Sequence, residues 1–460
     1  MRGFGLLWAL LVACYGDEES DVAAVPTSPV VVYFVVDTLG AAAATQTGFC
    51  EVVSAVARAH GTDAACVGDA VAPSSWTGES HVRMLWPEHL TGTRRGADQP
   101  DCEAVSMMSA VAAGTGGSYV VGAQNSVLGG LDSVTCRDGQ NAWFVGADVV
   151  HRGDRDGDDG PVGEGIVDLL AATASGAPAV ALLNSVEAGA HLPRCSDDAS
   201  TAACSGLFDL AVEYGHVPAD LPVERRAAWW ADGKNTFRFF ARVQTNRDVA
   251  RAAPLVAGTI EERILAHQAR TLVQRLEELV GGLEVQGRLD DLTLVVTSDH
   301  GENPCFADPV TGQVNCAHTG APTEWTAAVP VAVIPASRAA EWQASGLIGG
   351  EGVPWSTASL AWGLTEAAGV TPPSVWLEPP RRGLATSWSC MEQSRTTGGA
   401  SRFGLHVSEG GSLRCADGLC GAWSWSTMSD ALAVPTPLDA IPADLVAYAG
   451  PPDWATNACP

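Results

Sequence analysis

Residues Val30–Val36 (VVVYFVV) form an unbroken apolar run of mostly β-branched and aromatic side chains. A strand with one face in water alternates apolar and polar residues, whereas a strand of a parallel sheet covered on both faces is apolar throughout. Further apolar runs stand at Ser118–Val121, Ala179–Leu183, Leu292–Thr297 and Val329–Ile334. The sequence therefore predicts a mostly parallel sheet that is buried on both faces.

A helix is expected from Thr259 to about Val280, directly before the Leu292 strand. Thr259 and Glu262 fit a capping box at its start. Its apolar stripe consists of Leu265, Leu272, Leu276 and Leu279, which repeat at helical spacing. Because strands alternate with helices, the expected fold is an α/β sandwich whose central sheet is covered by helices.

The chain has 460 residues, of which 46% are hydrophobic and 17% charged, enough for one large α/β domain and a smaller appendage. The strand and helix pattern weakens after about residue 375. Pro379-Pro380, a stretch rich in Gly and Ser at 398–401 and scattered tryptophans follow. We therefore expect the large domain over residues 30–375 and a small C-terminal subdomain of short strands over 376–460.

The N-terminus has the features of an export signal. Phe4–Ala13 is an apolar run behind Arg2, too short to span a bilayer but suited to a signal peptide. Its end, Leu11-Val12-Ala13-Cys14, resembles a bacterial lipobox, in which Cys14 is lipidated and becomes the first mature residue. The alternative is an ordinary signal peptide that is cut nearby. We expect a signal peptide over 1–14, a tether over 15–29, and an exported protein that is periplasmic or anchored in the outer membrane.

The cysteine count agrees with export. Of 13 cysteines, an even number remains once Cys14 is set aside, which favours disulfides outside the cytoplasm. Connectivity does not follow from sequence. Three pairs are close enough along the chain to close local loops: Cys195/Cys204, Cys305/Cys316 and Cys415/Cys420.

The formal net charge of −27 bears on the partners of the protein. Nucleic acid is not expected, because nothing would neutralise its phosphates. The charge also argues against a simple electrostatic hold on an anionic substrate. If the substrate is an anionic ester, metal cations must supply the local positive charge.

Three of the predicted strands run into potential metal ligands. Asp37 follows the first strand, Glu187 and His191 follow the second, and Asp299 and His300 follow the third. Ligands of open α/β sheets gather at the carboxyl ends of the strands. A single acid there commonly caps the next helix, but three sets are less easily explained in that way. Such oxygen and nitrogen donors suit zinc, manganese or calcium.

Four segments resemble the sulfatase and alkaline phosphatase superfamily, in the order in which that family has them. They are VVYFVVDTLG at 31–40, APSSWTGESHVRMLWPEHLTG at 72–92, DDLTLVVTSDHGE at 290–302 and AHTGAPTEWTAAVPVAVIP at 317–335. The Ser-Asp-His-Gly-Glu sequence behind an apolar strand is the most specific part. The resemblance covers roughly residues 30–370 and implies an alkaline-phosphatase-like sandwich with a sulfatase-like catalytic domain.

The resemblance also implies a ligand set. It places Asp37, Asp299 and His300 on one metal ion, with Thr77 at the nucleophile position beside it. Members with two metals bind the second ion with an acid, a histidine four residues later and a distant histidine. The residues that fit this second set are Glu187, His191 and His318. In single-metal members a histidine at the place of His191 contacts the ester instead, so the resemblance makes His191 a catalytic or metal-binding residue.

Thr77 stands where true sulfatases carry a cysteine that is matured to formylglycine. Those enzymes have a proline two residues later and an arginine four residues later, where this chain has Glu79 and His81. The resemblance therefore favours members that use an unmodified threonine, among phosphodiesterases, phosphonate hydrolases and phosphoethanolamine transferases. The alternative is that Thr77 only caps the helix that starts near Gly78.

Taken together, these features predict a metal-dependent hydrolase of phosphate, phosphonate or sulfate esters with Thr77 as nucleophile and one or two divalent ions. The alternatives are a sulfatase without formylglycine, a phosphoethanolamine-type transferase, and an inactive lipid-anchored binding protein that keeps the fold. The expected partner is an anionic ester. A membrane contact is expected only through the lipid on Cys14, and the sequence sets no oligomeric state.

Overall fold

The computed structural model describes most of the predicted large domain and part of the C-terminal subdomain. The described residues are 28–87, 102–103, 105–124, 136, 141–153, 160–186, 220–222, 225, 260–301, 306–307, 314–315, 323–376, 379–380, 382–393, 399–409, 411–416, 419–424 and 434–436. The predicted signal peptide and most of the tether lie outside them. Among the helices described, none is long and apolar enough to cross a membrane.

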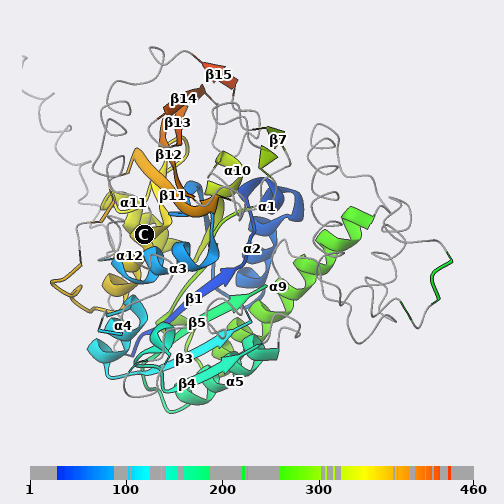
Figure 1. Cartoon of the computed structure of the whole chain (residues 1–460). Coiled ribbons are helices and arrows are strands. Elements are labelled where there is room, and N and C mark those ends of the chain that lie inside the picture. Colours follow the sequence, from blue (N-terminus) through cyan, green and yellow to red (C-terminus); the bar gives the residue numbers. More distant parts are fainter. Residues whose placement is uncertain are drawn as a thin grey trace, which may run out of the picture.

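A sheet of eight strands forms the centre of the large domain, in the order β10-β2-β9-β6-β1-β5-β3-β4. Figure 1 labels β1, β5, β3 and β4 of this sheet. Its strands are β1 (Val30–Val36), β2 (Ala65–Val71), β3 (Ser118–Ala123), β4 (Val149–Arg152), β5 (Ala179–Ser185), β6 (Leu292–Ser298), β9 (Ala328–Ile334) and β10 (Trp355–Ser356). β9 runs antiparallel to both of its neighbours, and the remaining described pairs are parallel. The predicted mostly parallel sheet is confirmed.

All five strands expected from the apolar runs are present, and β1, β5, β6 and β9 are buried along their whole length. The sequence did not predict the other three strands of this sheet: β2 and β4, which are partly exposed, and the buried two-residue β10. β2 also contains Gly68 and Asp69, two residue types that are rare in strands. They lie in a β-bulge, where the register with β9 shifts between Val67 and Ala70.

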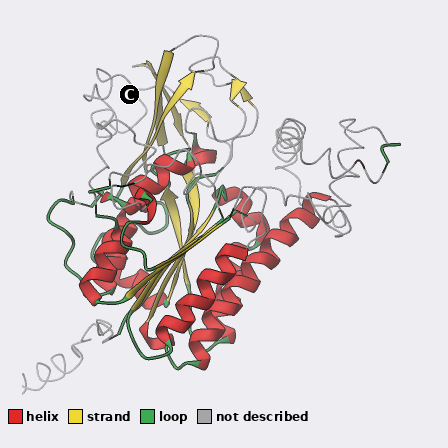
Figure 2. Ribbon diagram, turned by 60° about the horizontal axis from the view of Figure 1, so that its bottom comes forward, coloured by secondary structure: helices red, strands yellow, loops and turns green. Residues whose placement is uncertain are grey.

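Helices cover both faces of the sheet (Figure 2). The helices packed against Val30, Val32, Phe34 and Val36 of β1 are α1 (Ala41–Thr47), α2 (Phe49–Ala59), α5 (Gly160–Thr173) and α9 (Ile260–Val285). The helices on the face of Val31, Tyr33 and Val35 are α3 (Thr77–Leu85), α4 (Met107–Thr115), α11 (Ala336–Ala344) and α12 (Leu360–Ala367). Short elements are α10 (Glu324–Ala327), the pair β7 (Phe306–Ala307) and β8 (Val314–Asn315), and 3-10 helices at Ala142–Phe144, Leu289–Asp291 and Thr357–Ser359. The predicted sandwich is confirmed.

α9 is longer at its C-terminal end than the sequence predicts. Leu272, Leu276 and Leu279 are buried against the sheet as expected, while Thr259 and the side chains of Glu262 and Leu265 lie outside the description. The helix continues through Gly281-Gly282 to Val285. A Cβ at Gly282 would collide with Leu170 of α5, so this glycine permits close packing of two helices instead of ending one.

A second, antiparallel sheet follows the large domain, in the order β11-β12-β13-β14-β15. Its strands are β11 (Leu384–Gln393), β12 (Gly399–Ser408), β13 (Gly411–Ala416), β14 (Leu419–Ser424) and β15 (Val434–Thr436). Ala385, Leu405 and Val407 of this sheet pack against Val71 and Ala328 of the large domain. The small C-terminal subdomain is confirmed, and its boundary at residue 376 stays a prediction.

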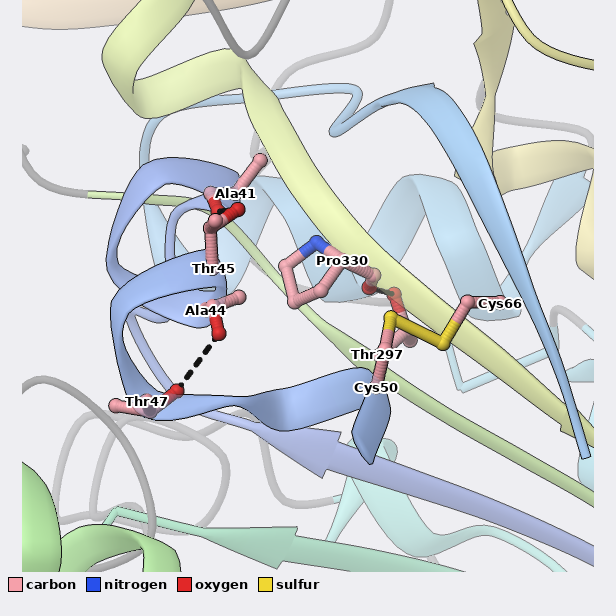
Figure 3. Close-up of a disulfide and its surroundings, with 8 residues drawn as sticks. All are labelled: Ala41, Ala44, Thr45, Thr47, Cys50, Cys66, Thr297 and Pro330. Atoms are coloured by element: carbon pink, nitrogen blue, oxygen red, sulfur yellow. Dashed lines mark hydrogen bonds between the residues drawn. A yellow bond between two sulfur atoms is a disulfide. The ribbon is translucent and has the colours of Figure 1, made fainter. Parts of the chain in front are cut away.

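Two disulfides are described, and neither was predicted. Cys50–Cys66 joins α2 to β2 (Figure 3), and Cys102–Cys136 closes a longer stretch of chain. They join cysteines 16 and 34 residues apart, so pairing by nearness along the sequence did not find them. Of the expected pairs, Cys195/Cys204 and Cys305/Cys316 lie outside the described residues. Cys415 is opposite Cys420 in the β13–β14 register, but their side chains are not described.

Figure 3 also shows Pro330 of β9 near this disulfide. Proline lacks an N–H group and is usually excluded from the middle of a sheet. Here the partners of the flanking residues are Val67 and Ala70, so Pro330 lies opposite the β2 bulge. Its carbonyl oxygen accepts a hydrogen bond from Thr297 Oγ1 at 3.0 Å. The bulge in β2 thus allows a residue without an N–H group at position 330 of β9.

His60, at the C-terminal end of α2, lies between two glutamates of α9. Its Nε2 is 2.6 Å from Glu277 Oε2, and its Nδ1 is 2.7 Å from Glu284 Oε2. The hydrogen bond to Glu284 and then that to Glu277 raise the pKa of His60. The ring also lies over Gly281, where a Cβ would come within 2.9 Å of His60 Cε1. A protonated His60 therefore bridges α2 and α9.

This bridge makes the stability of the fold depend on pH. Because the folded pKa of His60 is raised, its contribution is fully present below the unfolded value of about 6.5 and is lost as pH rises through the folded pKa. We expect the difference in unfolding free energy between wild type and His60→Gln to shrink as pH rises across that window. Urea unfolding of both proteins from about pH 5.5 to 9 measures it. A difference independent of pH would contradict the bridge.

Candidate active site

The register of the central sheet brings the predicted ligands together. Val36 of β1 is opposite Ser298 of β6 on one side and Ser185 of β5 on the other. Asp37 and Asp299, the next residues, therefore leave the sheet side by side, and both are fully buried. The backbone N–H of Asp37 continues the pairing by donating to Ser185 O at 2.9 Å.

Thr77 is the first residue of α3, and Trp76 occupies the N-cap position. The alternative in which Thr77 caps a helix starting near Gly78 is therefore wrong. The Thr77 hydroxyl oxygen instead lies 3.0 Å from His300 Nε2, and the side chain is buried. Segments more than 200 residues apart in the sequence thus meet at the carboxyl ends of β1 and β6.

The other ring nitrogen of His300 sets the tautomer. Nδ1 donates to the carbonyl oxygen of Gly301 at 2.9 Å, which leaves the lone pair on Nε2. Nε2 also lies 3.4 Å from Asp299 Oδ2. The lone pair of His300, the Thr77 hydroxyl and one oxygen of Asp299 therefore face a common point.

Hydrogen bonds hold the carboxylate of Asp299 through only one of its two oxygens. Asp299 Oδ1 accepts from the backbone N–H groups of Thr38 and His300, each at 2.9 Å. Asp299 Oδ2 is buried and accepts no hydrogen bond from any described residue. Burial, and after it the negative charge of Asp37, raise the pKa of Asp299. Two carboxylates thus lie together in the buried interior of the protein, which is unfavourable without a compensating positive charge.

These donors suit a divalent cation. A cation at Asp299 Oδ2 would satisfy this oxygen and offset the repulsion between the carboxylates. Carboxylate oxygens, a hydroxyl and a neutral imidazole are the ligands expected for zinc, manganese or calcium. Within the described part of the chain, however, no group of three or more His, Cys, Asp or Glu side chains forms a ready metal site. Asp37, Asp299 and His300 would therefore form only part of the ligand set of such a cation.

The remaining predicted site residues lie outside the described residues: Glu187, His191 and His318. The second metal set and the catalytic role of His191 accordingly stay predictions. The strand that leads to Glu187 is present, since β5 ends at Ser185, next to the end of β1.

Glu79, at the position where sulfatases carry proline, belongs to a buried polar network. Its Oε2 accepts from Ser74 Oγ at 2.7 Å, and its Oε1 is 3.5 Å from Arg83 Nη2. Arg83 Nη1 donates to Pro73 O at 3.0 Å. Burial lowers the pKa of Arg83, and the charge of Glu79 opposes that shift. The network ties the loop before Thr77 to α3.

His81, where sulfatases carry arginine, is fully buried beside the same point. Its Nδ1 lies 2.9 Å from Thr77 O and 3.8 Å from Asp299 Oδ2, and its Nε2 lies 3.4 Å from Asn184 Nδ2. Ser80 Oγ donates to Asp299 O at 2.5 Å. Sequence reasoning assigned no role to Asn184 or Ser80, because contacts with backbone carbonyls and single side chains leave no pattern along the chain.

Comparisons with known proteins agree with this architecture. No family model matches the sequence, and no curated protein matches it. Among solved structures, the phosphonate monoester hydrolase of Agrobacterium radiobacter matches with a TM-score of 0.52 and 11% identity, over 92% of this chain and 94% of that chain. The phosphonate monoester hydrolase SpPMH from Silicibacter pomeroyi matches with a TM-score of 0.51 and 13% identity, over 94% and 93%.

A third match is BT33494S-sulf, from the glycosaminoglycan metabolism of Bacteroides thetaiotaomicron. Its TM-score is 0.53 at 12% identity, over 90% of this chain and 92% of that chain. At such low identity these matches establish the fold. The expected resemblance to sulfatase-like proteins is thus confirmed as a resemblance in fold.

The variant Asp299→Asn tests whether the carboxylates of Asp37 and Asp299 bind a cation. Asparagine keeps an oxygen for the N–H groups of Thr38 and His300 but removes the charge that faces Asp37. With chelator present, we expect the variant to have a higher Tm than wild type. When manganese or zinc is added, the Tm of wild type should rise more than the Tm of Asp299→Asn. A ligand at 100 times its Kd stabilises the protein that binds it by about 2.7 kcal/mol.

The matched control is Asp290→Asn, because Asp290 is an exposed acid at the opposite end of β6. It should respond to chelator and metal as wild type does. Thermal unfolding of the three proteins in both conditions gives the answer. Equal metal-induced shifts in wild type and Asp299→Asn would place any bound cation elsewhere.

Proposed function

We propose that the protein is a metal-dependent hydrolase of phosphate, phosphonate or sulfate esters with Thr77 as its nucleophile. The observation that carries this proposal is the 3.0 Å contact between Thr77 Oγ1 and His300 Nε2 beside the buried pair Asp37 and Asp299. The fold shared with phosphonate monoester hydrolases supports the reaction class. We propose phosphonate monoesters and phosphate esters as the first substrates to test.

The chemistry follows from the weakness of a threonine hydroxyl as a nucleophile at neutral pH. Because Nδ1 of His300 donates to Gly301 O, the lone pair of Nε2 can either accept a hydrogen bond from the Thr77 hydroxyl or bind a cation, one at a time. A divalent ion held by Asp37, Asp299 and His300 would supply positive charge to the hydroxyl oxygen and to the anionic ester. The N-terminus of α3, at which Thr77 stands, adds the positive end of a helix dipole.

We further propose that Thr77 acts without modification. The two places at which formylglycine enzymes carry proline and arginine hold Glu79 and His81, both buried in this chain. Glu79 forms the network with Ser74 and Arg83, and His81 contacts Thr77 O and Asn184. The segment around the nucleophile therefore has an ordered set of contacts that does not depend on the sulfatase residues.

We also propose that the protein is exported and anchored by a lipid on Cys14, with the site turned away from the anchor. The first described residue, Ser28, is held by Arg288, whose Nη2 donates to Ser28 O at 2.6 Å. Ser28 precedes β1, whereas Asp37 follows it, so the two lie at opposite ends of the strand. This favours a soluble ester as substrate over a lipid headgroup of the anchoring membrane, and hence a hydrolase over a phosphoethanolamine-type transferase.

The anchor has its own test. Cys14→Ala should move the exported protein from the detergent phase to the aqueous phase in a detergent partition, since no lipid can be attached. Its kcat/KM for a soluble phosphonate ester should stay within about twofold of wild type, because the site does not involve the anchor. Wild-type protein found in the aqueous phase would contradict lipidation. Activity on vesicle lipids alone would contradict the proposed substrate.

Substitutions of Thr77 test the nucleophile. Thr77→Ala should lower kcat for aryl phosphate and phosphonate esters by at least about 10³-fold, because a methyl group cannot replace the alkoxide. Thr77→Ser should keep measurable activity, since it keeps the hydroxyl. Thr77→Cys should gain no sulfatase activity, because Glu79 and His81 stand in place of the formylglycine recognition residues. Initial rates on a panel of phosphate, phosphonate and sulfate esters decide these points.

The matched control is Thr45→Ala, which removes an exposed threonine hydroxyl of α1. It should leave kcat unchanged. If wild type and Thr77→Ala hydrolyse the panel equally, Thr77 is not the nucleophile. If neither hydrolyses any ester with zinc, manganese or calcium supplied, the protein is the catalytically inactive binding protein that the sequence leaves open.

A further inference from the structure

Thr38, directly after Asp37, has an unusual backbone conformation. Its φ is 61°, in the left-handed region that a β-branched residue rarely adopts. Among the described residues other than glycine, only Asp69 in the β2 bulge shares a positive φ. Thr38 is also fully buried. Strain of this kind persists only where the surroundings hold it in place, so the contacts of Thr38 indicate its role.

The left-handed turn redirects two successive N–H groups to the same neighbour. Thr38 N donates to Asp299 Oδ1 at 2.9 Å, and Leu39 N donates to Ser298 Oγ at 2.8 Å. In extended backbone, successive N–H groups point to opposite sides of the strand. Both donors here reach the end of β6, and Ser298 Oγ in turn donates to His300 O at 2.8 Å. The turn at Thr38 therefore fastens the end of β1 to the segment that carries Asp299 and His300.

The hydroxyl of Thr38 provides the second contact. Thr38 Oγ1 donates to Asp37 Oδ1 at 2.6 Å, while the N–H of the same residue holds Asp299. One residue thus donates to an oxygen of each buried carboxylate. With Oδ1 of Asp299 held, Oδ2 is turned toward His300 Nε2, 3.4 Å away. The rotation of both carboxylates depends on Thr38.

We propose that Thr38 is a positioning residue that orients Asp37 and Asp299 for a divalent cation, an inference that rests on the proposed function. Glycine would adopt this φ without strain but has no hydroxyl for Asp37. Valine would keep the shape of threonine and also lack the hydroxyl. The strained threonine combines the N–H direction that Asp299 needs with the hydroxyl that Asp37 needs.

Three variants of Thr38 separate positioning from stability. Thr38→Ser keeps the hydroxyl, Thr38→Val keeps the β-branch without the hydroxyl, and Thr38→Gly removes both the hydroxyl and the strain. We expect Val and Gly to weaken Mn²⁺ binding by about 10-fold to 100-fold, as loss of a residue that orients ligands does, and Ser to stay within about threefold of wild type. Calorimetric titration of the full-length protein with Mn²⁺ alone gives the Kd.

The Tm in chelator provides the readout that a merely structural role would not produce. Thr38→Gly should unfold at a higher temperature than Thr38→Val, because glycine adopts the positive φ without strain. It should nevertheless bind Mn²⁺ as weakly as Thr38→Val does. A purely structural role predicts that Mn²⁺ affinity follows Tm across the series. That pattern, or wild-type Kd values for both Val and Gly, overturns the proposal.

Asp299→Asn distinguishes this failure from failure of the proposed function. If Thr38→Val and Thr38→Gly bind Mn²⁺ like wild type while Asp299→Asn does not bind, the cation site stands and the role of Thr38 is wrong. If Asp299→Asn binds Mn²⁺ as tightly as wild type, the cation lies elsewhere, and both proposals fail. If Thr38→Val, Thr38→Gly and Asp299→Asn bind Mn²⁺ weakly while Thr38→Ser binds it nearly as tightly as wild type, the result supports both the cation site and the role of Thr38.

Discussion

The parallel pairing of β1 with β6 is the interaction on which the site depends. Val36 is opposite Ser298, so Asp37 and Asp299 emerge together at the edge of a sheet whose central strands are wholly buried. A shift of the register by one residue would turn every side chain of β1 to the other layer of the sandwich. The apolar packing on both faces therefore fixes the position of the two carboxylates as firmly as it fixes the core.

The same burial makes the negative charges of Asp37 and Asp299 unfavourable. Asp37 and Asp299 lie in an interior where uncompensated charge is unfavourable, and the pKa of Asp299 is raised as a result. Backbone N–H groups and the Thr38 hydroxyl stabilise one oxygen of each carboxylate. The remaining oxygen of Asp299, close to His300 Nε2, is where a cation would complete the arrangement. Under the proposed function, folding and cation binding would be coupled at this end of the sheet.

Features that depend on two segments at once were not predictable from either segment. Gly68-Asp69 in β2 and Pro330 in β9 each argue against a strand, yet the bulge of one strand lies opposite the proline of the other. Cys50 and Cys66 pair because α2 and β2 bring them together, although they are 16 positions apart in the sequence. The Glu79–Arg83 pair lies within one helix, but its burial was not predictable, since charges four residues apart on a helix usually lie on the surface.

The sequence by itself determined the strands that carry the site and the order of the residues at their ends. Runs such as Val30–Val36 are apolar on both faces, and this pattern is local, so the strand and the following Asp37 were readable from the chain alone. The tertiary structure decided how those ends face one another: the left-handed turn at Thr38, the tautomer of His300, and the contact of Thr77 with His300 across 223 positions. These depend on hydrogen bonds between groups that are distant in sequence, and only the packed sheet brings such groups within reach.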